Sequence, residues 1–191
     1  MKYNFKLVKL GSVNLSYKLK YVLLSLLSLF LLMACSIEDD LVQSETNDQK
    51  VTPLTELIET ENFKSNALEH IIEGELNYKG QAVGFHYSQL ESKKGEIINN
   101  SQTELDENEV YEAKVRIKDV NKTSNNGKST FFPDDWDTQD VVDAINEAYD
   151  NRTHINGNTF EGLTAEGIIV RMYLTEHNQI ISAFPVYEGG G

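Results

Sequence analysis

The stretch Val110-Tyr-Glu-Ala-Lys-Val-Arg-Ile-Lys118 alternates between apolar and charged side chains. Successive side chains of a strand point to opposite faces, so this period of two places the apolar residues on one face and the charged residues on the other. The stretch therefore predicts a half-buried strand, and with it a sheet that packs one face on a core.

Two further strands are predicted in the last third of the chain, at residues 167–175 and 179–187, joined by a turn around Glu176-His-Asn178. A short turn between two apolar runs favours antiparallel pairing. Residues 81–87 are rich in aromatic and β-branched residues, which indicates either a strand or a loop that enters one.

Two helices are predicted on either side of the central strand. Residues 66–73 carry apolar side chains at helical spacing, and Gly74 follows as a stop. A second helix begins after a cap at Asp137 or Thr138 and ends in the segment 151–157. The expected fold class is α+β, with short N-terminal helices followed by a twisted antiparallel sheet and one helix (Asp137–Asn151) packed on it.

The N-terminus has the pattern of an export signal. Five lysines without any acidic residue precede the apolar run from Tyr21 to Ala34, which is shorter than the roughly 20 residues of a spanning helix. Leu32-Met-Ala-Cys35 resembles the bacterial lipobox, in which the cysteine receives lipid. We expect residues 1–34 to be a lipoprotein signal peptide and Cys35 to anchor the chain at the extracytoplasmic face of the cell membrane; a buried structural cysteine is the alternative.

Residues 35–61 are polar and acidic, which predicts a flexible tether before a folded domain at 62–191. Removal of the signal leaves 12 basic and 30 acidic residues, a net charge of −18. Such a surface argues against broad capture of polyanions, although it permits a small basic pocket. Because Cys35 is the only cysteine, the exported part has no internal disulfide.

Several common catalytic patterns are absent. The chain has no His-Glu-x-x-His zinc motif and no Gly-x-Ser-x-Gly nucleophile elbow. Gly127-Lys-Ser129 is not a phosphate loop, because position 122 holds lysine where that motif requires glycine. These absences argue against a zinc peptidase, an α/β-hydrolase and a nucleoside-triphosphate site.

Two histidines and one lysine remain as a chemical set. His70 lies near the end of the first helix and His86 lies in an aromatic stretch, whereas His154 and His177 fall in predicted turns and are expected to be exposed. Cleavage of RNA by a ribose 2′-hydroxyl needs a base, an acid and a positive charge near the phosphorane. Histidines suit the first two tasks near neutral pH, and Lys128 is a candidate for the third.

Four sequence blocks occur in an order that resembles bacterial EndoU-type endoribonucleases, over roughly His70 to Tyr187. They are His70-Ile-Ile-Glu-Gly74, Gly84-Phe-His86, Gly127-Lys-Ser-Thr-Phe-Phe-Pro-Asp-Asp-Trp136 and Ser182-Ala-Phe-Pro185. The resemblance implies an EndoU-like fold for residues 62–191. It also implies cleavage of RNA, typically near uridine, to leave 2′,3′-cyclic phosphate ends.

The resemblance assigns roles to individual residues. His70 matches the general acid, His86 the general base and Lys128 the lysine of the triad. Substrate contacts are expected at Ser129, Ser182 and Phe184. Phe184 stands where many members have tyrosine, which retains a stacking ring but removes a hydroxyl, and the usual Gly-Gly-His block is reduced to Gly84-Phe-His86.

The expected partners are RNA, the membrane through the lipid on Cys35, and an inhibitor or immunity protein, and the expected state is a monomer. No cofactor is expected to be required, with manganese dependence as the alternative. Two other readings stay open: a catalytically inactive EndoU-like binding module, and an unrelated surface lipoprotein.

Overall fold

A computed structural model describes residues 51–91 and 93–190 of the 191-residue chain. The predicted signal peptide, Cys35 and the first part of the predicted tether lie outside the described residues. No helix in the described ranges has both the length and the apolar character needed to cross a membrane.

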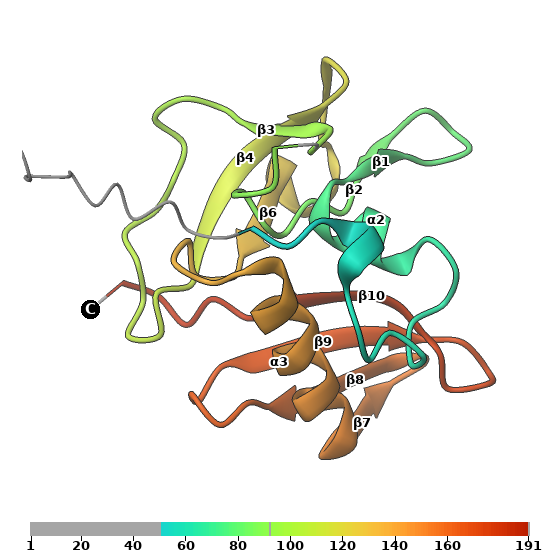
Figure 1. Cartoon of the computed structure of the whole chain (residues 1–191). Helices are drawn as coiled ribbons and strands as arrows, with labels where there is room; N and C mark the ends of the chain where they lie inside the picture. Colours follow the sequence, from blue (N-terminus) through green and yellow to red (C-terminus); the bar gives the residue numbers. More distant parts are fainter. Residues whose placement is uncertain (1–50, 92, 191) are drawn as a thin grey trace, which may run out of the picture. The chain divides into compact units, whose positions relative to one another are not determined.

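Four antiparallel strands form one sheet, and α3 (Thr138–Asp150) packs on it through contacts with β8 and β9 (Figure 1). Their spatial order is β10 (Ile180–Pro185), β9 (Ile169–Leu174), β8 (Thr159–Leu163) and β7 (Thr153–Asn156). The predicted C-terminal hairpin is thus confirmed as β9 and β10. β7 and β8 are not predicted by the sequence: β7 falls within residues 151–157, which the sequence assigns to the end of the helix, and residues 159–163 carry no predicted element.

A second sheet is built around β4 (Tyr111–Ile117), the strand predicted from its alternating pattern. Its side chains alternate between buried positions such as Val115 and exposed positions such as Lys114. The strands beside it are β3 (Gly95–Ile97), β5 (Val120–Asn121) and, further along, β6 (Lys128–Phe131). In the described residues the single predicted sheet is therefore two four-stranded antiparallel sheets and a two-stranded hairpin, while the α+β class is confirmed.

The remaining elements are short. They are η1 (Leu54–Glu56), α2 (Ala67–Ile72), the hairpin β1 (Glu75–Leu76) and β2 (Ala82–Val83), and the 3₁₀ turn η2 (Ser124–Gly127). Only Ala82 and Val83 of the predicted strand at 81–87 pair as a strand, because Gly84 and Phe85 both adopt positive φ and turn the chain away.

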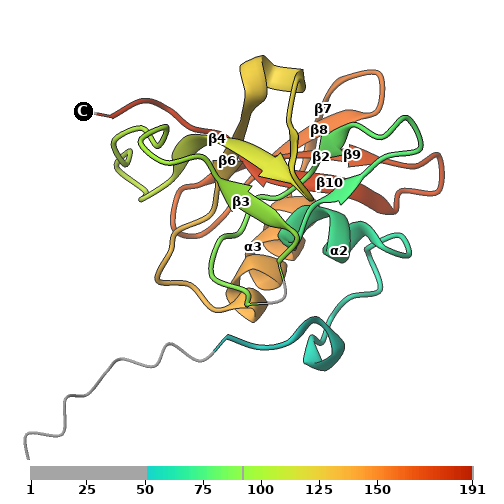
Figure 2. The ribbon, with the colours of Figure 1, turned by 90° about the horizontal axis from the view of Figure 1, so that it is seen from above.

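The two sheets have separate cores. α3 buries Val141, Val142 and Ile145 against the first sheet, and a capping box of Asp137 and Asp140 closes its N-terminus. Aromatic side chains dominate the second core, where Phe131 stacks on Tyr111 with ring centroids 5.0 Å apart. β6 of the second sheet contacts β10 of the first, and the view in Figure 2 shows these strands side by side. The candidate functional site lies at this junction between β6 and β10.

The folded unit begins earlier than the sequence suggested. Residues 51–61, which the sequence assigned to the flexible tether, run along the N-terminal part of α3. The backbone N–H and the hydroxyl of Thr52 each donate to the Asp137 carboxylate at 2.6 Å, and Ile58 donates to Gln139. A carboxylate accepts several hydrogen bonds, so Asp137 can cap the helix and also bind Thr52. The sequence around Thr52 does not reveal this distant partner.

Candidate active site

The two histidine blocks are joined through their backbones. The Phe85 N–H donates to the carbonyl of His70 at 3.1 Å, and the His86 N–H donates to the carbonyl of Ile71 at 2.7 Å. Gly84 makes this junction possible, because its φ is +74° and a Cβ there would lie 2.0 Å from the His70 carbonyl oxygen. Phe85 also has a positive φ of 66°, which is uncommon for a residue with a side chain.

His86 is held by the backbone and by an aromatic ring. Its Nδ1 lies 2.8 Å from the carbonyl oxygen of Thr130, and its ring stacks on Phe184 with centroids 5.1 Å apart. A carbonyl only accepts hydrogen bonds, so Nδ1 carries the hydrogen and Nε2 keeps the lone pair. Burial lowers the pKa of His86 well below its ordinary value, and the charge of Lys122 lowers it further, so the ring is neutral at pH 7.

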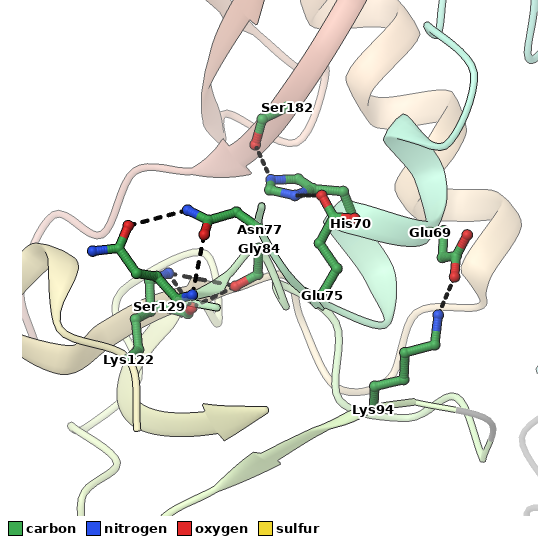
Figure 3. A network of polar contacts seen from close by, with 10 residues as sticks. Glu69, His70, Glu75, Asn77, Gly84, Lys94, Lys122, Ser129 and Ser182 are labelled. Carbon is green, nitrogen blue, oxygen red and sulfur yellow. Dashed lines mark hydrogen bonds and ion pairs between the residues drawn. The ribbon is translucent and has the colours of Figure 1, made fainter. Parts of the chain in front are cut away.

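His70 is held by side chains instead. Its Nδ1 lies 3.0 Å from a carboxylate oxygen of Glu75, and its Nε2 lies 3.1 Å from the hydroxyl of Ser182, as Figure 3 shows. Burial lowers the pKa of His70, and the Glu75 carboxylate opposes this by stabilising the imidazolium. His70 therefore retains a proton more readily than His86.

A local irregularity in β10 sets the position of Ser182. Ile180 pairs with Leu174 and Ser182 pairs with Tyr173, so Ile181 is an extra residue on β10. Such a β-bulge re-aims the side chains that follow it and is common beside active sites. The regular alternation expected from sequence did not reveal this bulge.

Lys122 is the lysine whose charge acts on both histidines. Its ammonium donates to the Ser129 hydroxyl at 2.7 Å and to the Gly84 carbonyl at 3.4 Å (Figure 3). Burial lowers its pKa to about 8, and its charge lowers the pKa of both His70 and His86. In the sequence, Lys122 stands out only because it replaces the glycine that a phosphate loop requires. No pattern in the sequence marks it as part of the site.

Lys128, which the sequence predicted as the third catalytic group, bonds instead to the Glu112 carboxylate at 2.6 Å. Ser129 is 1% exposed, and its hydroxyl donates to Gly84 while accepting from Lys122. Ser129 thus contacts Lys122 from a buried position, and its contact with substrate stays a prediction. The catalytic role of either lysine stays a prediction.

One pocket, with a volume of about 800 Å³, contains all six of the predicted catalytic and substrate-binding residues. They are His70, His86, Lys128, Ser129, Ser182 and Phe184, and Lys122 joins them. His154 lies on β7 rather than in the predicted turn, but it is exposed as expected, and so is His177. Neither of these two lines the pocket.

Two histidines and two lysines therefore line one pocket, whose size is typical for ligands. Among residues 51–91 and 93–190, no group of three or more histidine, cysteine or acidic residues is arranged to hold a metal ion.

Comparison with known families agrees with this geometry. The family model described as Bacterial EndoU nuclease matches residues 64–187, which is more than half of the chain. The chain belongs to the bacterial EndoU nuclease family. The reading as an unrelated surface lipoprotein is therefore wrong as regards the folded domain.

A relative of the EndoU domain is a Bacillus cereus protein named "Toxin". The two are 47% identical over 132 residues, which cover 69% of this chain but only 24% of that protein. The EndoU chain thus spans about a quarter of the length of its curated relative. No solved structure matched the chain.

Proposed function

We propose that the EndoU domain cleaves RNA by attack of a ribose 2′-hydroxyl, which leaves a 2′,3′-cyclic phosphate and a 5′-hydroxyl. The observation that carries this proposal is the pair of histidines in one pocket, with His86 Nε2 as a lone-pair acceptor and His70 held by a carboxylate. This pair matches the two proton transfers that the reaction requires.

In the proposed first step, His86 acts as the general base. Its Nε2 takes the proton of the 2′-hydroxyl while the 2′-oxygen forms a bond to phosphorus. The Thr130 carbonyl stabilises the imidazolium that results, because it accepts the Nδ1 hydrogen bond. A depressed pKa keeps the base ready at neutral pH at the cost of some basicity.

His70 acts as the general acid for the leaving group. In its protonated form, Nδ1 donates to Glu75, and the proton on Nε2 passes to the departing 5′-oxygen as the bond from phosphorus to that oxygen breaks. The Ser182 hydroxyl is hydrogen-bonded to the same Nε2 atom and fixes the orientation of the His70 ring. Phe184, stacked on His86, offers a ring beside the place of the nucleobase.

The ammonium of Lys122 stabilises the negative charge that develops on the non-bridging oxygens. It is anchored by Ser129 and Gly84, so little reorganisation is needed during the reaction. Lys128 is the alternative source of this charge, and substitution of each lysine distinguishes them. The proposed mechanism uses no metal, and a manganese requirement is the competing possibility.

The test is cleavage of a uridine-containing RNA by the purified full chain in EDTA, with analysis of the product ends. We expect cyclic-phosphate ends from the parent and a loss of about 10²- to 10⁴-fold in kcat/KM for His86→Ala. His154→Ala is the matched control, because His154 is exposed and outside the pocket. Intact RNA with the parent, both in EDTA and with manganese, would favour the inactive binding module.

Two partners follow from the same proposal. The name "Toxin" of the relative supports an inhibitor or immunity protein that covers the pocket, and such a protein would abolish cleavage at a stoichiometric ratio. Lipid on Cys35 would hold the domain at the extracytoplasmic face of the membrane. The mass of the mature N-terminal peptide tests this, and an unmodified Cys35 would exclude the anchor.

A further inference from the structure

The outer face of the second sheet carries basic residues that begin at the pocket and continue away from it. Lys128 on β6 lines the pocket, and its cross-strand partner on β4 is Lys114. Arg116 follows on the same face of β4, because side chains two positions apart point the same way. Lys114, Arg116 and Lys128 are called the basic track here.

The pairing of Lys114 with Lys128 is unfavourable for the isolated domain. Like charges directly opposite each other on neighbouring strands destabilise a sheet. Lys128 is partly compensated by Glu112, and Arg116 by Glu96 at 2.6 Å. Lys114 is exposed, and its ammonium has no partner among the described residues.

The charge of the whole chain makes this feature informative. After the predicted cleavage the chain carries −18, so most of its surface repels a polyanion. A row of basic side chains next to the pocket would offset this repulsion for an RNA strand that reaches the histidines. The basic track is continuous with the pocket through Lys128. Lys114 lies directly across from Lys128 on the same sheet face, so the two ammonium groups can contact neighbouring phosphates of one strand.

We propose that the basic track binds the phosphates of single-stranded RNA that flank the scissile one, with Lys128 nearest the pocket and Lys114 next. Lys128 is then a binding residue, while Lys122 acts on the reacting phosphate. Glu112 holds the Lys128 side chain in place when no RNA is bound. The inference rests on the proposed function, because it assigns a path to the same substrate.

The test is binding of a fluorescent 12-nucleotide oligodeoxyuridylate to the full chain at several salt concentrations. This probe has the phosphates of RNA but no 2′-hydroxyl, so it measures the path without cleavage. Each phosphate contact in a single strand contributes about 0.7 to the slope of log affinity against log salt. We expect the slope to fall by about 1.4 in Lys114→Gln/Lys128→Gln.

Two controls separate the track from general charge effects. Lys64→Gln/Lys79→Gln removes the same net charge at exposed lysines outside the track and should leave the slope unchanged. Glu112→Gln should tighten binding, because it releases Lys128 and removes a negative charge beside it. An unchanged thermal unfolding midpoint in the double variant would show that its lowered slope does not come from misfolding.

The outcomes are distinguishable from those of the cleavage assay. Equal slopes for the parent and the Lys114/Lys128 variant, or no binding of the probe by the parent, would overturn the basic track. Either result leaves the proposed function standing if the parent still cleaves RNA to cyclic-phosphate ends. A lowered slope with intact RNA in that assay would support the track on a domain that binds RNA without cutting it.

Discussion

The surroundings of His86 and His70 differ in kind, although the two rings share one pocket. His86 is 5% exposed and held by a backbone carbonyl and a phenyl ring, whereas His70 is held by a carboxylate and a hydroxyl. The Thr130 carbonyl is neutral, so burial dominates and lowers the pKa of His86. At His70 the charged Glu75 carboxylate opposes the lowering of the pKa by burial. In the proposed mechanism, two identical side chains thus take opposite tasks because their neighbours differ.

Separating the two histidines should have the largest effect. In Gly84→Ala the added Cβ would lie 2.0 Å from the His70 carbonyl oxygen, so the junction between α2 and the His86 segment must open. We expect kcat/KM for RNA cleavage to fall by about 10³-fold, because both proton transfers lose their alignment.

Gly80→Ala is the matched control for that change. Gly80 has nearly the same positive φ, 72°, but nothing lies within 4 Å of its added Cβ. It should cost about 1–2 kcal/mol of folding free energy from backbone strain alone, with activity retained. Equal losses of activity in both variants would mean that strain, and not the clash with His70, decides the outcome.

Removing the charge of Lys122, which acts on both histidines, should have an intermediate effect. Lys122→Gln is expected to lower kcat by about 10²-fold, because a positioned donor to the phosphorane oxygens is lost. It should also move both limbs of the pH profile to higher pH, since the Lys122 charge lowers both histidine pKa values.

Lys128→Gln should raise KM for long RNA and leave kcat for a dinucleotide nearly intact. If Lys128→Gln lowers kcat for the dinucleotide while Lys122→Gln does not, Lys128 is the triad lysine that the sequence predicted. Both variants remove one positive charge from the same pocket, so their difference shows which lysine acts on the reacting phosphate.

A change at Glu75 should act on one histidine only and have the smallest effect. Cleavage needs neutral His86 and protonated His70, so kcat/KM falls at acidic pH below the pKa of His86 and at alkaline pH above that of His70. Because both pKa values are lowered, the optimum should lie below 6.5.

In Glu75→Gln the pKa of His70 falls further, so the alkaline limb moves to lower pH while the acidic limb stays. Glu69→Gln, which removes a carboxylate that bonds to Lys94 rather than to histidine, should leave both limbs in place. Movement of the acidic limb in Glu75→Gln would assign His70 and His86 the reverse roles. These profiles can be recorded with a dinucleotide substrate.

Local patterns were enough to predict much of the fold. The alternation in 110–118 gave β4, the two apolar runs gave β9 and β10, and the spacing after Asp137 gave α3. β7 was not predicted because all four of its residues are exposed, and β8 was not predicted because glycine is its only fully buried residue, so neither strand has a marked apolar face. The six residues predicted from residue type and from the family resemblance all line the pocket, whereas Lys122 and Arg171, which also line it, were not predicted.

The sequence by itself determined the family, the α+β class, the histidines and the acidic charge, because each depends on residue type, spacing or order along the chain. Only the tertiary structure decided which lysine charge acts on both histidines, which ring nitrogen of His86 is free, and that Ser129 bonds to Lys122. These depend on contacts such as Gly84 with His70 and Thr130 with His86. Such contacts join separate segments, and side-chain direction at a bulge or a positive φ follows no sequence period.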